Sequence, residues 1–262
     1  MVLTLRSSVP LARARISDGK HDAPMEIEPS NGPDGRVLRG LWGVDFETAV
    51  GARSIEVETV GRCGDPHPAP WKFKVVSGKF IVQKLTVDPA YVEPPPSEQE
   101  RIARDREKVA AVWAAAPTAR QWERPFALPV EAPQRENFGA RRVLNGKTQS
   151  RHGGVDLVAP AGVPIKAPAS GTVRLAEDLY FSGGTVIVDH GGDLFTTYFH
   201  MSRIDVKPGD RVHTGDVLGA VGATGRVTGP HLHWGARLGG ARINPLGLLE
   251  LPAWSLPPGG GP

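Results

Sequence analysis

Apolar and polar residues alternate with a period of two along most of this chain, a pattern that predicts β-strands. In the first third, the alternating runs are residues 41–46, 54–60, 71–76 and 80–87, and Gly and Pro residues separate them. Short strands at this spacing are typical of a small antiparallel sandwich. We therefore expect an immunoglobulin-like β-sandwich over residues 1–95, closed by the last of these runs.

One segment, residues 97–116, has a helical pattern instead. Its apolar side is formed by Ile102, Val109, Val112 and Trp113, with Arg and Glu residues opposite. Ser97 and Glu100 have the spacing of a capping box, and three prolines before them predict a stiff, extended connector. We expect this linker and helix, residues 96–125, to brace two domains. A helix that binds a partner is the alternative.

After residue 126 the composition changes, because Gly and Pro recur every few residues. Short β-type runs lie between them, at 171–175, 185–189, 195–199, 217–221 and in the segment around residue 232. These runs predict a largely antiparallel β domain over residues 126–251, followed by a mobile Pro/Gly-rich tail over 252–262. The expected fold class is therefore mainly β, with two domains and one linking helix.

Composition narrows the classes of partner. The 262 residues include 31 Lys and Arg against 28 Asp and Glu, a formal net charge of +3. This mild excess suits an anionic polymer such as the cell wall, although ordinary solvated charge explains it too. No dense basic stripe points to nucleic acid, and no apolar run is long enough to span a membrane. The first residues lack the apolar stretch of a secretory signal, so the chain either stays in the cell or is a form without its leader.

The candidate chemistry centres on residues 229–235, where two histidines stand two residues apart. In a strand, His231 and His233 share one face while Leu232 and Trp234 share the other. Imidazole is the commonest protein ligand of zinc and the usual acid or base near neutral pH. A plain polar strand face is the alternative interpretation of this pair alone.

Further candidate ligands lie elsewhere in the chain. His152 and Asp156 are separated by a Gly-Gly pair, which favours a loop that leads into a strand. These two residues and one of the two histidines of the strand would form a set of two imidazoles and one carboxylate, typical of a catalytic zinc site with one open position. Cys63 is the only cysteine, which excludes an intrachain disulfide and a site built of several thiolates. Calcium and magnesium prefer shells of oxygen alone.

Together these motifs resemble those of the lysostaphin-type, or LytM-like, zinc metallopeptidases, which cut peptidoglycan cross-links. The resemblance covers residues 126–249. It is carried by Phe138-Gly139-Ala140-Arg141-Arg142, His152-x-x-x-Asp156, Asp189-His190-Gly191, Tyr198-x-His200 and Gly225-x-x-x-Gly229-Pro230-His231-x-His233. It implies that His152, Asp156 and His233 bind one zinc ion per chain, and that His200 and His231 are catalytic histidines.

The resemblance also implies an activity and a setting. We expect hydrolysis of peptidoglycan cross-links by a metal-activated water, of the D,D-endopeptidase type, in a monomer of the periplasm or the secreted cell envelope. The alternatives are a non-catalytic wall-binding or amidase-activating scaffold of the same fold, and an endopeptidase specific for glycyl-glycine.

Three residues are candidate substrate contacts. Tyr198 lies two residues before His200 and would face the same side of that strand, although simple packing is equally compatible with the pattern. Asn137 and Arg142 are expected to line the groove and meet acidic stem peptides, with a surface ion pair as the alternative. His190 starts a His-Gly-Gly turn, and we expect a structural role for it.

Overall fold

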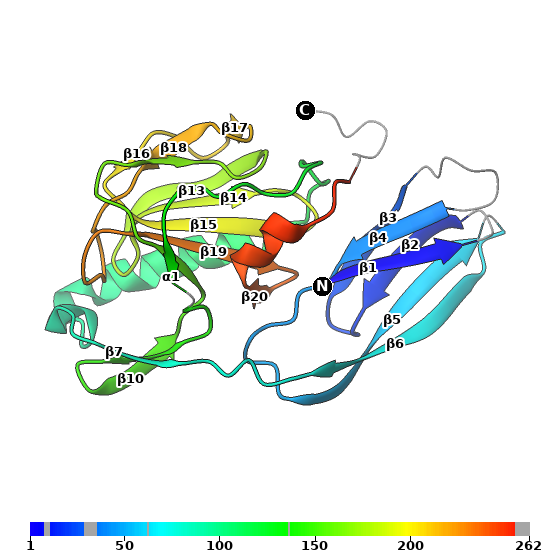
Figure 1. Ribbon diagram of the computed structural model, residues 1–262, viewed down its shortest axis with the longest axis horizontal. Coiled ribbons are helices and arrows are strands. Elements are labelled where there is room, and N and C mark those ends of the chain that lie inside the picture. Colours follow the sequence, from blue (N-terminus) through cyan, green and yellow to red (C-terminus); the bar gives the residue numbers. More distant parts are fainter. Residues whose placement is uncertain (8–10, 29–35, 62, 136, 255–262) are drawn as a thin grey trace.

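The computed structural model describes residues 1–7, 11–28, 36–61, 63–135 and 137–254, and it is mainly β. This confirms the expected fold class. Figure 1 shows a smaller sheet at the N-terminal end beside a larger β domain that holds the rest of the chain. Within the described residues, no helix is both long and apolar enough to cross a membrane.

The N-terminal part is one antiparallel sheet of six strands in the order β1-β4-β3-β2-β5-β6. Its strands are β1 (Val2–Ser7), β2 (Leu11–Ser17), β3 (Asp22–Glu28), β4 (Arg36–Leu41), β5 (Gly51–Gly61) and β6 (Pro66–Val75). Leu3, Ile16, Leu38 and Ile55 come from four of these strands and are buried in one core. Because hydrogen bonds link all six strands in a single path, the predicted two-sheet immunoglobulin-like arrangement is not confirmed.

Two strand predictions in this part need correction. The run at 41–46 is a strand only to Leu41, because the following residues leave the sheet toward the C-terminal domain, where Phe46 packs on Phe138 with ring centroids 5.3 Å apart. The run at 80–87 does not close the N-terminal sheet. It contains β7 (Val82–Leu85), which pairs in parallel with β9 (Arg141–Leu144), and β9 pairs with β10 (Lys147–Arg151).

The C-terminal domain has the predicted antiparallel sheet, in the order β17-β13-β14-β15-β19-β11-β8 with β20 added to β19. Its strands are β8 (Gln134–Arg135), β11 (Gly154–Leu157), β13 (Gly171–Leu179), β14 (Gly183–Asp189), β15 (Leu194–Met201), β17 (Arg211–Val212), β19 (Leu232–Leu238) and β20 (Ala241–Ile243). A second sheet contains β12 (Pro164–Lys166), β18 (Val217–Ala220) and β16 (Arg203–Ile204). The 3₁₀ helices are η1 (Pro89–Tyr91), η2 (Pro96–Glu98) and η3 (Pro245–Glu250).

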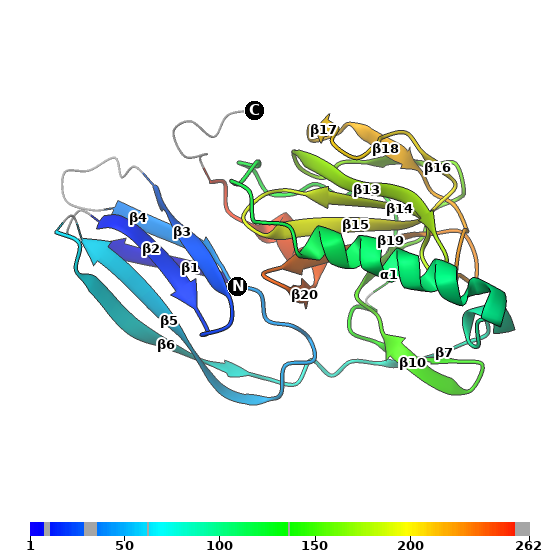
Figure 2. The same ribbon diagram turned by 180° about the vertical axis from the view of Figure 1, so that it is seen from behind.

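Different elements pack on the two faces of the large sheet. Val188, Tyr198 and Trp234 point into the main core, which they share with Ile165 and Leu218 of the small sheet. The opposite face is covered over part of its area by helix α1 (Gln99–Trp113), as Figure 2 shows. The side chains beneath this helix include Leu175, Ile187 and Phe195. The remainder of this second face carries the candidate site.

Helix α1 belongs to the C-terminal domain. The expected apolar side is confirmed, since Ile102 and Val112 are buried, and an ion pair of 2.7 Å joins Arg101 to Asp178 of β13. The predicted capping box is absent: Glu98 is the N-cap residue, and no side chain caps the first turn. Because the helix lies along one domain, it does not brace two domains.

The predicted mobile tail starts with an ordered residue. Trp254 is buried against Trp122, with ring centroids 5.8 Å apart, and Arg120 lies over its ring. Arg120 also pairs with Glu26 of the N-terminal sheet at 2.7 Å, so the start of the tail joins a contact between the two parts. Residues 255–262 lie outside the described part of the chain.

His190 makes the stability of the fold depend on pH. Its ring is fully buried between the carbonyl oxygen of Ser170, at 2.8 Å, and the hydroxyl of Thr196, at 2.7 Å. Burial lowers the pKa of His190 from 6.5 to about 4. Between these values the unfolded chain binds the extra proton, so stability falls as the pH falls. We expect this group to remove about 2 kcal/mol of unfolding free energy between pH 7 and pH 5.

Denaturant titrations of the wild type and of His190→Gln at both pH values measure this contribution. The variant is expected to be less stable at pH 7 but to have a smaller loss on acidification. Equal losses in the two proteins would mean that His190 is not kept neutral by the fold.

Candidate metal centre

The structure brings together the three residues that the sequence motifs single out as ligands. His152 lies in the loop between β10 and β11, while Asp156 of β11 and His233 of β19 face each other as paired residues of adjacent strands. His152 Nε2 is 3.1 Å from Asp156 Oδ1 and 2.7 Å from His233 Nδ1, and the last two atoms are 3.2 Å apart. All three side chains are buried. The predicted loop leading into a strand at residues 152–156 is therefore confirmed.

This triangle of atoms fits a zinc ion. Bonds of 2.0 to 2.2 Å in a tetrahedral shell separate neighbouring ligand atoms by about 3.3 Å, close to the three distances observed. The Nδ1–H of His152 donates to the backbone oxygen of Asn137 at 3.0 Å, which leaves a lone pair on Nε2. A lone pair and a carboxylate oxygen that face each other repel unless a cation or a proton lies between them. The donor set therefore suits a divalent metal.

Asn137 and Arg142 hold the carboxylate in place. Asn137 Nδ2 donates to Asp156 Oδ2 at 2.7 Å, and an Arg142 guanidinium nitrogen lies 3.1 Å from the same oxygen. Both donors use Oδ2, so Oδ1 is left for a metal. The expectation that Asn137 contacts substrate is wrong in this structure, because its side chain is buried and bonded to Asp156. Arg142 does line the groove, but its charge is paired with Asp156.

Replacing Asn137 with Ala is expected to weaken zinc binding by roughly 10- to 100-fold, the usual cost of losing a partner that orients a ligand. A chelator competition assay measures the affinity. Asn137 Oδ1 also accepts a hydrogen bond from the backbone N–H of Asp156 at 3.3 Å. Asn244→Ala is the control, because Asn244 Oδ1 likewise accepts from a backbone N–H, that of Leu246 at the start of η3. Equal zinc affinity in the wild type and Asn137→Ala would rule out this orienting role.

Two further histidines face the same space. His231 Nε2 lies 3.5 Å from Asp156 Oδ1, and the rings of His200 and His231 have centroids 4.9 Å apart. The Nδ1–H of His231 donates to the oxygen of Gly229 at 2.8 Å, and that of His200 to the oxygen of Thr224 at 2.9 Å. In the neutral form of either ring, Nε2 therefore carries the lone pair. The shared face predicted for His231 and His233 is confirmed.

A β-bulge directs His200 into the site. Val186 of β14 pairs with Tyr198, but Gly184 pairs with Met201, so β15 has one extra residue here. The backbone of His200 has a φ of 66°, a conformation that residues other than Gly rarely adopt. The bulge turns its ring to the open face, while Tyr198 points to the core.

The substrate contact expected for Tyr198 is therefore wrong. This side chain has no exposed area, and its hydroxyl shares a hydrogen bond of 2.7 Å with Thr196. The sequence pattern placed it with His200 only because simple alternation does not include the bulge.

Burial and hydrogen bonding set the charges of these groups. Burial opposes the charge on Asp156, but the neighbouring His152 and His233 outweigh it and hold the pKa of Asp156 well below its usual range. Burial lowers the pKa of His233 to about 4 and that of His200 well below 6.5. At neutral pH Asp156 is therefore ionised and His233 is neutral, the forms in which these two groups bind a metal.

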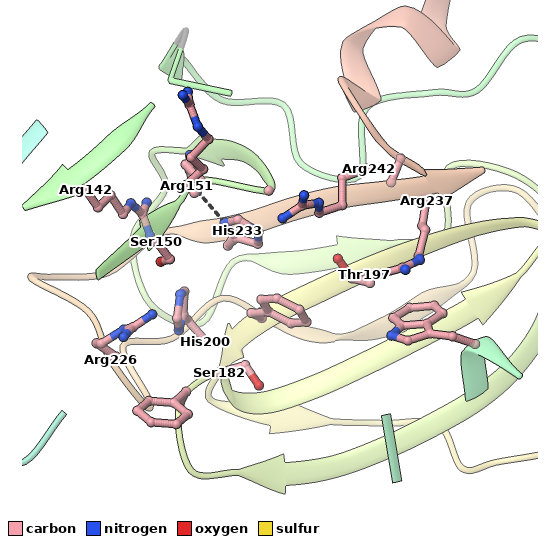
Figure 3. Close-up of a pocket in the computed structure, with 16 residues that line it drawn as sticks. Arg142, Ser150, Arg151, Ser182, Thr197, His200, Arg226, His233, Arg237 and Arg242 are labelled. Atoms are coloured by element: carbon pink, nitrogen blue, oxygen red, sulfur yellow. Dashed lines mark hydrogen bonds between the residues drawn. The ribbon is translucent and has the colours of Figure 1, made fainter. Parts of the chain in front are cut away.

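The site opens into a groove, shown in Figure 3. Phe199 stacks on the ring of His233 with centroids 5.0 Å apart and planes inclined by 6°. From there the groove runs along β19 past Ala236 to Arg237, which lies over the ring of Trp113 from α1. Sequence reasoning missed both Phe199 and Trp113, because their roles depend on the packing of distant segments.

Comparisons with known proteins identify the family of the part of the chain that carries this site. The model of peptidase family M23 matches residues 150–245. The chain is 42% identical over 118 residues to the peptidoglycan DD-endopeptidase ShyC of Vibrio cholerae, in an alignment that covers 44% of this chain and 27% of ShyC. It is 39% identical over 111 residues to the DD-carboxypeptidase/endopeptidase Mpg of Neisseria meningitidis, covering 42% of this chain and 26% of Mpg.

A similar solved structure extends over almost the whole chain. It is a crystal structure from Pseudomonas aeruginosa, described as a candidate peptidase M23, with a TM-score of 0.69 and 30% identity. The match covers 95% of this chain and 92% of that chain. By contrast, the chain spans about a quarter of the length of the curated relatives that it matches.

Proposed function

Because the chain belongs to peptidase family M23, we propose that it is a zinc metalloendopeptidase that hydrolyses peptide cross-links of bacterial peptidoglycan. The observation that carries this proposal is the triangle formed by His152, Asp156 and His233, whose three ligand atoms are 2.7 to 3.2 Å apart. His200, from β15, and His231, two residues before His233, face the same space.

In this proposal, His152 Nε2, Asp156 Oδ1 and His233 Nδ1 hold the ion. When bound, zinc polarises a carbonyl group and lowers the pKa of water toward about 7. His231, whose Nε2 is a free acceptor 3.5 Å from Asp156 Oδ1, takes the proton of the attacking water. His200 is neutral because of its burial, so its Nε2 accepts a hydrogen bond and orients that water.

The substrate and the setting are part of the same proposal. ShyC and Mpg are both named for D,D-peptidase activities, and ShyC for peptidoglycan. We infer a D,D-endopeptidase that works as a monomer outside the cytoplasm, where its polymer lies. An endopeptidase for glycyl-glycine bridges would use the same metal centre, so the choice of cross-link needs a direct test.

Metal analysis and digestion of purified peptidoglycan test the proposal together. We expect one zinc per chain, conversion of cross-linked muropeptide dimers to monomers by mass spectrometry, loss of activity with a chelator and recovery with added zinc. Protein that binds no zinc and leaves the cross-links intact would point to a non-catalytic wall-binding or amidase-activating scaffold. Cleavage of glycine bridges alone would overturn the assigned substrate.

A further inference from the structure

The groove beside the metal centre is lined by cations. None of the described residues that line it is Asp or Glu, and five arginines contribute to its wall: Arg142, Arg151, Arg226, Arg237 and Arg242. A groove of one sign attracts ligands of the opposite sign and strengthens their binding where water is excluded. The ligand expected here is therefore a peptide with free carboxylates.

Three of these arginines already have partners. Arg142 pairs with Asp156 at 3.1 Å, Arg242 pairs with Asp45 at 2.9 Å, and Arg151 donates to the backbone oxygen of Gly139 at 3.1 Å. By contrast, Arg226 and Arg237 have no hydrogen bond or ion pair with a carboxylate anywhere in the described part of the chain. These two cations remain available to a ligand.

Arg226 is held close to the metal centre by its own loop. Its backbone N–H donates to the oxygen of Phe181 at 2.8 Å, and its guanidinium group lies 5.1 Å from the centre of the Phe181 ring. Two residues earlier, Thr224 accepts the hydrogen bond that orients His200. Gly225, at φ 71°, packs so closely that a Cβ atom there would lie 2.4 Å from the nitrogen of Gly183. The loop therefore places Arg226 firmly.

The neighbouring charge that acts on Arg226 is positive. Burial and the nearby Arg142 both lower the pKa of Arg226. Arg142 itself forms an ion pair with Asp156. In Figure 3, Arg226 and Arg142 lie together on one side of His200 and His233, while Arg237 lies on the other. A substrate carboxylate beside Arg226 would relieve the repulsion between the two guanidinium groups and gain a bidentate, charge-assisted pair.

We propose that Arg226 binds a free carboxylate on the carbon next to the nitrogen of the cleaved amide, and so selects cross-links made by a diamino dicarboxylic acid. This inference rests on the proposed peptidase function. A cross-link through the side-chain amine of diaminopimelate has a carboxylate at this position, whereas the corresponding lysine cross-link has only hydrogen there. The two substrates thus differ by the one group that Arg226 recognises.

The test compares two synthetic peptide dimers, joined from D-alanine to diaminopimelate or to lysine. For the zinc-loaded wild type, we expect kcat/KM to be roughly 10- to 100-fold higher on the diaminopimelate dimer, the range for a hydrogen bond between charged groups. Arg226→Gln should lose this preference by slowing cleavage of the diaminopimelate dimer alone. Its rate on the lysine dimer should stay near that of the wild type, which also serves as a check that the variant is folded.

Arg237→Gln is the matched control in the same groove. Arg237 lies four residues after His233 on β19, about 13 Å along the strand, too far to reach a carboxylate beside the cleaved bond. This variant should therefore keep the preference for diaminopimelate, whatever its absolute rate.

The outcomes separate the two proposals. If the wild type cleaves neither dimer nor intact peptidoglycan, the proposed peptidase function fails and this inference with it. If it cleaves both dimers equally well, or if Arg226→Gln keeps the full preference, the peptidase function stands and the role of Arg226 is overturned. Loss of the preference in Arg237→Gln but not in Arg226→Gln would also overturn it.

Discussion

Replacing His233 with Ala is expected to remove bound zinc and peptidase activity together. His233 supplies one of three atoms in a triangle with edges of 2.7 to 3.2 Å, and two ligands alone hold zinc weakly. Loss of a partner that only orients a ligand costs 10- to 100-fold, so loss of a ligand should lower activity by at least about 1000-fold. Metal content by mass spectrometry and kcat/KM on cross-linked muropeptides measure the two effects.

His213→Ala is the control for this variant, because His213 lies on the surface and its side chain pairs, among the described residues, only with Asp216, at 3.5 Å. It should keep both zinc and activity. The zinc-free His233→Ala chain is expected to stay folded, since Leu232 and Trp234, on the opposite face of β19, remain in the core. A variant with full activity and no zinc would exclude a metalloenzyme.

The residues of this site that belong to motifs of neighbouring residues were predictable from sequence, whereas those defined by contacts between distant segments were not. His152, Asp156 and His233 were predictable as candidate ligands because the family resemblance rests on motifs of short, fixed spacing, and strand alternation alone placed His231 and His233 on one face. The roles of Asn137 and Tyr198 were not. Asn137 is bonded to a carboxylate 19 residues away, at 2.7 Å, and no local pattern encodes that contact.

Tyr198 shows why alternation fails at a functional strand. Regular pairing would place Tyr198 and His200 on one face, but the extra residue in β15 puts them on opposite faces. This arrangement requires a strained backbone at His200, with a φ of 66°, and backbone strain of this kind is common at functional sites. The sequence gives no sign of the bulge, because Phe199 and His200 both fit an ordinary strand.

In the fold, local patterns predicted strands better than their partners. β13, β14, β15 and β19 were expected from alternating or apolar runs, and all are present. β7 was expected as a strand, but it pairs with β9, and each pair joins residues that lie 59 positions apart in the chain. β6 was shortened in the prediction because Pro66, Pro68 and Pro70 suggest a loop. It is an edge strand, where a missing N–H need not break the ladder.

Replacing His231 with Ala is expected to separate catalysis from metal binding. His231 lies outside the group formed by His152, Asp156 and His233, so the variant should keep one zinc per chain. Loss of a general base typically lowers the rate by 10²- to 10⁴-fold, and we expect kcat to fall within this range. KM should change little, because His231 is not among the described residues that line the groove.

His200→Ala should behave similarly, and the double variant should lose little more than either single one, because groups that act in one step are not additive. The opposite result is informative because His231 Nε2 lies 3.5 Å from Asp156 Oδ1, a spacing that a fourth ligand would also have. If His231→Ala lost its zinc along with its activity, His231 would be a ligand, and the open position required for water would not exist. Retained zinc with a large loss of kcat therefore supports the base assignment, whereas joint loss refutes it.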